Sequence, residues 1–137
     1  MSTKVNVTWK DQMTFNAKVN GFDIIIDAEE NVGGRNLGPR PKPLSLASLG
    51  GCTGMDVISI LEKMRVKPDF FDVEIEAETS DQHPKYYKAI HIKYIFKGDN
   101  LPMDKLEKAV NLSQDRYCGV SYMLRQSSDL TFEIVVL

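Results

Sequence analysis

Two cysteines, Cys52 and Cys118, are the side chains of this chain best suited to covalent chemistry. A cysteine thiolate can attack the O–O bond of a peroxide and become a sulfenic acid, which a second thiol then converts to a disulfide. The two residues do not form the C-x-x-C motif of thioredoxin-like proteins, and a disulfide between them requires Cα atoms within roughly 7 Å. The pattern favours thiol redox chemistry, and the alternative that both thiols are buried only for packing stays open.

The two histidines, His83 and His91, are the other candidates for chemistry. Neither has metal-ligand spacing with a cysteine, so we expect no zinc site, no other metal and no cofactor. A Cys–His protease arrangement would need one of them, but no local signature matches. Both lie in or beside a predicted strand hairpin, where a surface or packing role is expected.

The first cysteine lies in a stretch of uncharged residues, 44–55, that reads LSLASLGGCTGM. This stretch is too short to span a membrane, and it predicts a helix over residues 44–65 that is buried on most of its faces. Burial raises the pKa of a thiol, so an ionised Cys52 needs an opposing influence. Asp56, one turn after Cys52, acts in the wrong direction unless it is itself paired.

Two features of the sequence could favour a thiolate at Cys52. A helix broken at Gly50-Gly51 would place Cys52 near the start of a new helical segment, where backbone N–H groups favour an anion. The alternative is that these glycines only permit close packing. Cations could also come from the Gly- and Pro-rich loop at residues 28–43, which contains Arg35, Arg40 and Lys42. Arginine is preferred because its planar fork can hold a carboxylate and point a donor at the sulfur at once.

Alternation of apolar and polar residues predicts the elements that position these side chains. Three strands, at about residues 5–10, 15–19 and 22–26, precede the loop, and Asn20-Gly21 predicts a hairpin. After the first helix we expect a strand hairpin with acids set against bases on its wet face. A second helix over 101–116, a last helical turn at 120–126 and a final strand at 130–136 follow. This order predicts one α+β domain over residues 1–137 with largely antiparallel sheet.

Composition and charge limit the classes of partner and the cellular location that we expect. The net charge is −2 and the pI is about 5.7, so no nucleic-acid partner is expected. Residues 1–20 lack the apolar core of a signal peptide, and no uncharged stretch is long enough for a membrane span. We therefore expect a cytoplasmic protein with no membrane partner, in which both thiols are normally reduced.

Two motifs carry a resemblance to a known family. Residues 38–61, GPRPKPLSLASLGGCTGMDVISIL, look like the central-helix signature of the OsmC/Ohr family, in the subgroup with G-P-x-P, L-G-G-C-T and D-V. Residues 116–124, RYCGVSYML, resemble the second-cysteine segment of that subgroup, and the resemblance covers essentially the whole chain. It implies an α+β OsmC-like fold, with antiparallel sheets packed on a long buried central helix, in an intertwined homodimer.

The resemblance also implies an activity. The best-known members reduce organic hydroperoxides and are recycled by dithiols, so Cys52 would be the peroxidatic cysteine and Cys118 the resolving one. The implied partners are a small-molecule hydroperoxide, a dithiol reductant and a second copy of the chain.

The sequence departs from the family at the residues that activate the peroxidatic thiolate. Peroxidase members activate the thiolate with an Arg–Glu pair, whose Glu lies upstream of the first cysteine; Lys42 and Pro43 occupy the matching positions here. Lys18 is the nearest basic residue to the expected Arg. A second reading follows, in which the protein lacks peroxidase activity and binds a small apolar ligand or handles thiols otherwise.

Overall fold

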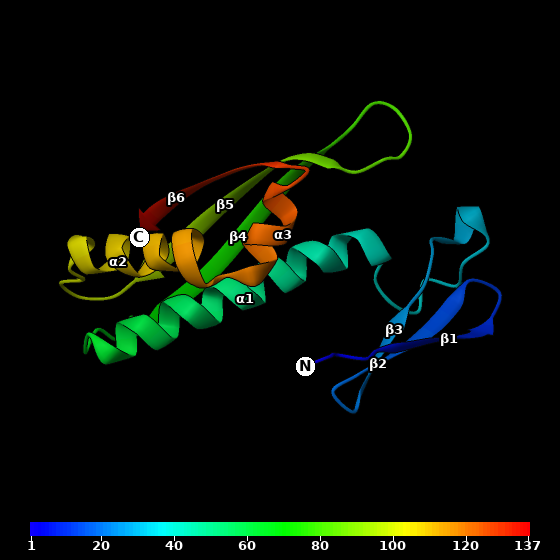
Figure 1. Ribbon diagram of the computed structural model, residues 1–137, viewed down its shortest axis with the longest axis horizontal. Coiled ribbons are helices and arrows are strands. Elements are labelled where there is room, and N and C mark those ends of the chain that lie inside the picture. Colours follow the sequence, from blue (N-terminus) through cyan, green and yellow to red (C-terminus); the bar gives the residue numbers. More distant parts are fainter. The chain divides into compact units, whose positions relative to one another are not determined.

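The computed structural model describes residues 1–137, and contacts divide the chain into two units, Met1–Ala47 and Ser48–Leu137. The order of elements confirms the predicted α+β class: three strands, a long helix, a strand hairpin, a helical region and a last strand (Figure 1). Each unit carries its own three-stranded sheet.

The first unit is built on an antiparallel sheet of β1 (Asn6–Asp11), β2 (Thr14–Val19) and β3 (Phe22–Ile26). Asn20 and Gly21 both have positive φ, 51° and 83°, so the predicted hairpin turn joins β2 to β3.

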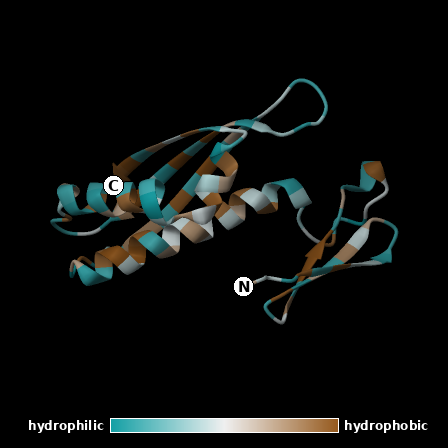
Figure 2. Ribbon diagram, in the orientation of Figure 1, coloured by the Kyte–Doolittle hydropathy of each residue, from teal (hydrophilic) through white to brown (hydrophobic).

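Apolar side chains of the three strands line up across this sheet, with Val7 opposite Ala17 and Ala17 opposite Ile24. Trp9 and Phe22 are more than half exposed in the single chain, and β3 is coloured as apolar along most of its length in Figure 2. The apolar face is therefore incompletely covered by this chain alone.

Asp27 organises the loop that follows β3. Its buried carboxylate accepts the Thr14 hydroxyl at 2.8 Å and the backbone N–H groups of Ala28, Arg35 and Leu37 at 2.7, 3.4 and 3.3 Å. The loop also contains a short 3-10 helix, Glu30–Val32. One carboxylate thus satisfies several backbone donors that no regular element pairs.

The long helix α1 (Pro41–Lys63) is continuous through Gly50-Gly51, so the hypothesis of a helix break before Cys52 is wrong. The close-packing alternative is correct for Gly50, because a Cβ there would lie 3.2 Å from the Ile75 Cδ1 atom, whereas nothing lies within 4 Å of one at Gly51. The helix begins earlier than predicted because prolines are tolerated in a first helical turn.

Only one stripe of α1 is buried, so the prediction that the helix is buried on most faces is wrong for this chain. Met55 is 76% exposed and Ile58 is 42% exposed. By length and composition α1 could cross a membrane, although the core helices of soluble proteins pass the same test. The residues of the buried stripe recur every fourth position, as on one helix face: Leu49, Thr53, Val57 and Leu61.

The second unit contains a mixed sheet of β4 (Phe70–Thr79), β5 (Tyr87–Lys97) and β6 (Asp129–Val136), with β5 in the centre. The β4–β5 hairpin is antiparallel as predicted, but β6 runs parallel to β5. The helical region between β5 and β6 provides the crossover that a parallel pair requires.

The two faces of this sheet differ in polarity. On one face the β5 residues Ile90, Ile92, Tyr94 and Phe96 are buried, and on the other Glu74 lies opposite Lys93. Glu76 likewise lies opposite His91, which confirms the predicted acid-against-base arrangement. In Figure 1, α1 and α2 lie on the same side of the sheet.

The helical region has three parts: α2 (Met103–Leu112), a π-helical turn (Ser113–Tyr117) and α3 (Gly119–Arg125). Leu106 and Val110 of α2 and Ser113 of the π turn are fully buried, whereas Met103 is 42% exposed. The π turn, which the sequence did not predict, ends where the Cys118 N–H donates to the Ser113 carbonyl at 2.8 Å. Such turns often occur at functional sites.

The one-sided burial of α1 can be tested by substitution. We expect Leu61→Ala to lower the free energy of unfolding by about 2–5 kcal/mol, because it leaves a cavity at a fully buried position. Lys63→Ala, at an exposed position of the same helix, should change it by less than about 0.5 kcal/mol. Urea unfolding followed by circular dichroism measures both. Equal losses in the two variants would contradict this packing.

Candidate active site

The two cysteines, far apart in the sequence, lie side by side in the second unit. Cys52 is half-buried in the middle of α1, and Cys118 is 4% exposed at the start of α3. They lie 3.3 Å apart, and both are free thiols. Two free thiols this close together can be joined by oxidation to a disulfide, so the arrangement suits thiol redox chemistry.

Burial raises the pKa of the Cys118 thiol, and the neighbouring Cys52 sulfur raises it further. Ser121 opposes this, because its backbone N–H donates to the Cys118 Sγ atom at 3.4 Å and its hydroxyl also favours the thiolate. That hydroxyl is buried and has no other hydrogen-bond partner, so it is free to donate to an anionic sulfur. Burial has the largest effect on the pKa of Cys118, so Cys118 is a neutral thiol that can donate its proton toward Cys52.

A carboxylate completes the cluster. The Sγ atoms of Cys52 and Cys118 and a carboxylate oxygen of Asp56 all lie within 4.8 Å of one another. The Asp56 Oδ2 atom accepts a hydrogen bond from the Ser113 hydroxyl at 2.9 Å. The sequence predicted that an unpaired Asp56 opposes ionisation of Cys52. Its partner here is a neutral hydroxyl, which leaves the negative charge of Asp56 beside the thiols.

Asp56 is the end of a buried hydrogen-bonded network. The Thr53 Oγ1 atom lies 2.7 Å from the Ser113 Oγ atom and 2.7 Å from the Tyr94 hydroxyl. Gln114 Nε2 donates to the Tyr94 oxygen at 2.6 Å and to Thr53 at 3.3 Å. The network therefore connects α1, β5 and the π turn beneath the two sulfurs.

Arg125 holds the far end of this network. Its guanidinium donates to the Gln114 backbone carbonyl at 2.8 Å and to the Gln114 Oε1 atom at 2.7 Å. Burial raises the pKa of Tyr94, although its hydrogen bonds with Thr53 and Gln114 oppose the shift. Tyr94 is thus a neutral phenol that can donate one proton and accept another.

Two of these polar residues occupy positions of otherwise apolar sequence patterns. Tyr94 shares a strand face with Ile90, Ile92 and Phe96, and Ser113 follows Leu106 and Val110 at helical spacing. A polar side chain on a buried face needs a partner, which is the physical reason to group them. Nothing in their spacing paired Thr53 with Ser113, because that pairing depends on the π turn.

Three of the four predicted activating cations have partners within the first unit. Lys18 pairs with Asp23 at 2.8 Å, Arg35 donates to the Thr14 hydroxyl at 2.8 Å, and Arg40 donates to the Asn36 side chain. The fourth, Lys42, lies in the first turn of α1, where its carbonyl accepts the Ser45 hydroxyl. The idea that one of these cations activates Cys52 stays a prediction.

The cluster of Cys52, Asp56 and Cys118 also offers three donor atoms to a metal ion. Thiolates with a carboxylate suit zinc, but structural zinc sites use four protein ligands, and catalytic sites three with an open position. The prediction of no metal site considered only the histidines as possible ligands beside the cysteines, and did not include Asp56.

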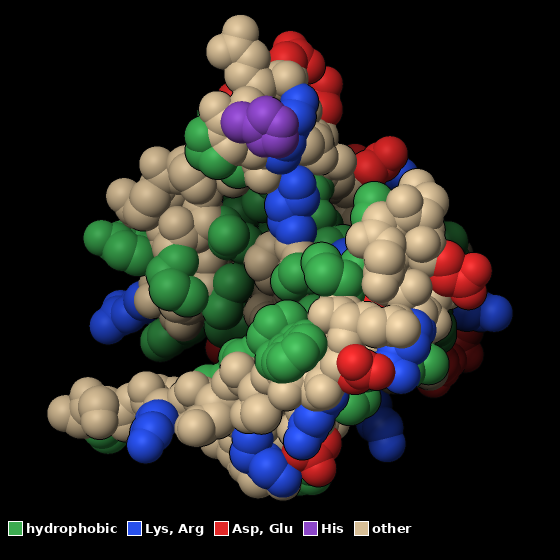
Figure 3. All heavy atoms as spheres, turned by 90° about the vertical axis from the view of Figure 1, so that its right-hand side faces the viewer, with side chains coloured by type: hydrophobic (Ala, Val, Ile, Leu, Met, Phe, Trp, Pro, Cys, Tyr) green, Lys and Arg blue, Asp and Glu red, His purple; other side chains and the backbone are tan.

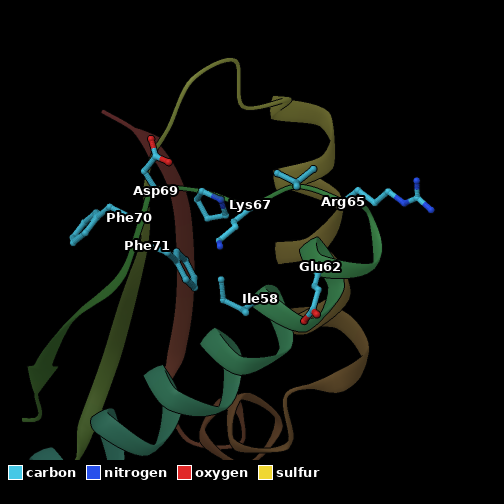
Figure 4. Close-up of a pocket in the computed structure, with 9 residues that line it drawn as sticks. Ile58, Glu62, Arg65, Lys67, Asp69, Phe70 and Phe71 are labelled. Atoms are coloured by element: carbon cyan, nitrogen blue, oxygen red, sulfur yellow. The ribbon is translucent and has the colours of Figure 1, made fainter.

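A separate hollow of about 520 Å³ lies where α1 ends and β4 begins (Figure 4). Ile58, Phe70 and Phe71 give it apolar walls, while Glu62 and Lys67 bring charges to it. Neither cysteine lines this hollow, so it is a different place from the thiol site.

The fold agrees with comparisons to known proteins. A family model described as OsmC-like protein matches residues 33–133. Protein YhfA of Escherichia coli K12 is 30% identical over 135 residues, which is 96% of this chain and 98% of YhfA. A hypothetical protein from Aquifex aeolicus superposes with a TM-score of 0.84 at 29% identity, covering 100% of this chain and 98% of its own. The chain belongs to the OsmC-like family.

Structures with lower identity show the same fold. The organic hydroperoxide resistance protein OhrB of Bacillus subtilis has a TM-score of 0.60 at 20% identity and covers 98% of each chain. These comparisons confirm the predicted OsmC-like α+β fold.

The raised pKa of Cys118 predicts how its alkylation depends on pH. In a Cys52→Ser variant, we expect the midpoint of alkylation by iodoacetamide to lie above the ordinary thiol value of about 8.5, because burial disfavours the thiolate. Limited access of the reagent to Cys118 slows alkylation by the same factor at every pH. The pH midpoint of the reaction therefore reports the ionisation of the thiol and not its accessibility. The same variant unfolded in guanidinium should return to the ordinary value. A folded midpoint at or below that value would contradict the assignment of Cys118 as a neutral thiol.

Proposed function

We propose that this protein reduces organic hydroperoxides with Cys52 as the peroxidatic and Cys118 as the resolving cysteine. The observation that carries the proposal is the 3.3 Å separation of the two cysteines, with Cys52 the more accessible. Relatives of the same fold named as organic hydroperoxide resistance proteins support it.

The proposed first step is attack of the Cys52 thiolate on the terminal oxygen of the hydroperoxide. An S–O bond forms and the O–O bond breaks, so the sulfur becomes a sulfenic acid and the alkoxide leaves with a proton as an alcohol. In the second step the Cys118 sulfur attacks Cys52, the S–O bond breaks, and hydroxide leaves with a proton as water. An external dithiol then reduces the disulfide by exchange.

The neutral Cys118 thiol suits this order of events. As a donor beside Cys52 it stabilises a thiolate there, because a hydrogen bond to the charged form favours that form. Its own thiolate is needed only after Cys52 has been oxidised. The raised pKa of Cys118 therefore directs the peroxide to the first cysteine and not to the second.

We propose further that the working form is a cytoplasmic homodimer. The supporting observation is the amount of apolar surface that one chain leaves open, including Trp9, Phe22 and Met55. Hydrophobic side chains lie open among lysines and arginines on the face of the molecule in Figure 3. Large exposed apolar areas are typical of surfaces that another chain covers.

A second candidate function is binding of a small apolar ligand without peroxide turnover. The hollow lined by Ile58, Phe70 and Phe71 favours it, since ligand pockets of this kind combine apolar walls with a few charged groups. Lys42 and Pro43 stand where the resemblance places the Glu of the family's Arg–Glu pair, and Lys18 is the basic residue nearest to the expected Arg, which points the same way.

An assay of peroxide consumption tests the main proposal. With dithiothreitol or reduced lipoamide as reductant, we expect the unaltered protein to turn over cumene hydroperoxide and Cys52→Ser to lose that activity. Cys118→Ser should turn over more slowly than the unaltered protein, because its sulfenic acid has no neighbouring thiol and must react with the external dithiol. Ser59→Ala, on the exposed side of α1, serves as the control. Equal rates in the unaltered and Cys52→Ser proteins would remove the proposal and leave the ligand-binding candidate.

A further inference from the structure

We propose that Asp56 is the acid–base residue of the thiol site, shuttling the protons that both redox steps require. This inference rests on the proposed function and adds to it a third reacting group. It starts from the cluster in which an Asp56 carboxylate oxygen and the two sulfurs lie within 4.8 Å of one another.

Repulsion between like charges disfavours the form of this cluster in which Cys52, Asp56 and Cys118 are all ionised. Three anions so close together repel one another strongly, and a neighbouring like charge disfavours ionisation of each group. The other ionisable groups of the network are Tyr94, on β5, and Arg125, on α3; both reach Asp56 only through intervening side chains. A proton that leaves Cys52 therefore has a nearby acceptor in the Asp56 carboxylate.

The hydrogen-bond network leading to Asp56 has one direction. Arg125 can only donate, so the atom of Gln114 that it contacts is the carbonyl oxygen, and the Gln114 amide must donate to Tyr94. At the other end the Asp56 carboxylate can only accept, so Ser113 donates to it.

The hydroxyl groups between these ends are then fixed in turn. Because the Ser113 proton points at Asp56, Thr53 donates to Ser113, and Tyr94 in turn donates to Thr53. A row of donors thus converges on the Asp56 carboxylate and holds it beside the two sulfurs, near the proton of either thiol.

The proposed proton path balances both chemical steps. Asp56 takes the proton of the Cys52 thiol, the thiolate attacks the peroxide, and the Asp56 carboxylic acid then protonates the departing alkoxide. In the second step Asp56 takes the proton of the Cys118 thiol and gives it to the hydroxide that leaves Cys52. After each step Asp56 is again a carboxylate.

The test compares two reactions of Cys52 in reduced protein, in a buffer that contains a metal chelator. Reaction with cumene hydroperoxide needs a proton for its leaving group, whereas alkylation by iodoacetamide releases iodide and needs none. For Asp56→Asn, we expect the rate constant with peroxide at neutral pH to fall by about 10²-fold, the lower range for general acid–base catalysis. Alkylation of Cys52 should stay as fast as in the unaltered protein or become faster, because a negative neighbour of the thiolate is gone.

Each result of this comparison contradicts a different part of the proposal. If both reactions of Asp56→Asn slow equally, Asp56 does not supply the proton of the leaving group; if the peroxide reaction is unchanged, Asp56 is not the proton shuttle; either result overturns this inference. An unaltered protein that does not react with peroxide overturns the proposed function, and this inference with it. Asp104→Asn, exposed on α2, controls for loss of a charge.

A second measurement needs no variant and so does not depend on the folding of Asp56→Asn. In the unaltered protein, D2O should slow the reaction with peroxide and leave the pH-independent alkylation rate of Cys52 unchanged. Equal isotope effects on the two reactions would overturn the assignment of Asp56.

Discussion

The thiol site depends on the hydrogen bonds that the fully buried Thr53 makes in the interior of the second unit. Its hydroxyl joins α1 to Tyr94 on the sheet and to Ser113 at the start of the π turn. An unpaired buried hydroxyl costs about 1–3 kcal/mol, so sliding α1 along the sheet by one turn is unfavourable. Cys52 precedes Thr53, and Cys118 ends the π turn that Ser113 begins. Fixing these two polar residues against each other therefore also fixes the two sulfurs.

The same network controls charge at the site. A carboxylate beside two thiols would oppose thiolate formation if it acted only through its field, and this was the difficulty that the sequence raised for Asp56. In the proposed proton path, the carboxylate that these hydrogen bonds hold in place accepts the proton of the thiol. Under this proposal the site needs no permanent cation next to Cys52, and Lys42 and Pro43 stand where the resemblance places the Glu of the activating pair.

Local sequence patterns predicted most of the helices and strands, but they did not predict most of the contacts between these elements. Alternating residues located the strands, and the Asn20-Gly21 turn follows from residues that accept positive φ. The continuity of α1 through Gly50-Gly51 was not predictable, because packing against Ile75 overrides the weak helix propensity of glycine. The parallel pairing of β6 and the π turn at Ser113 depend on tertiary contacts. The candidate pair of cysteines was found by residue type, but their proximity required the fold.

We infer that Cys52 and Cys118 form a redox pair within one chain. The most direct test of this inference is to treat the reduced protein with one equivalent of an organic hydroperoxide and analyse it, without reductant, by mass spectrometry of intact protein and of proteolytic fragments. We expect the loss of two hydrogen atoms from the intact chain and a disulfide that joins the Cys52 and Cys118 fragments. A protein that keeps both thiols, or that accumulates oxygen on Cys52 with no disulfide to Cys118, would contradict it.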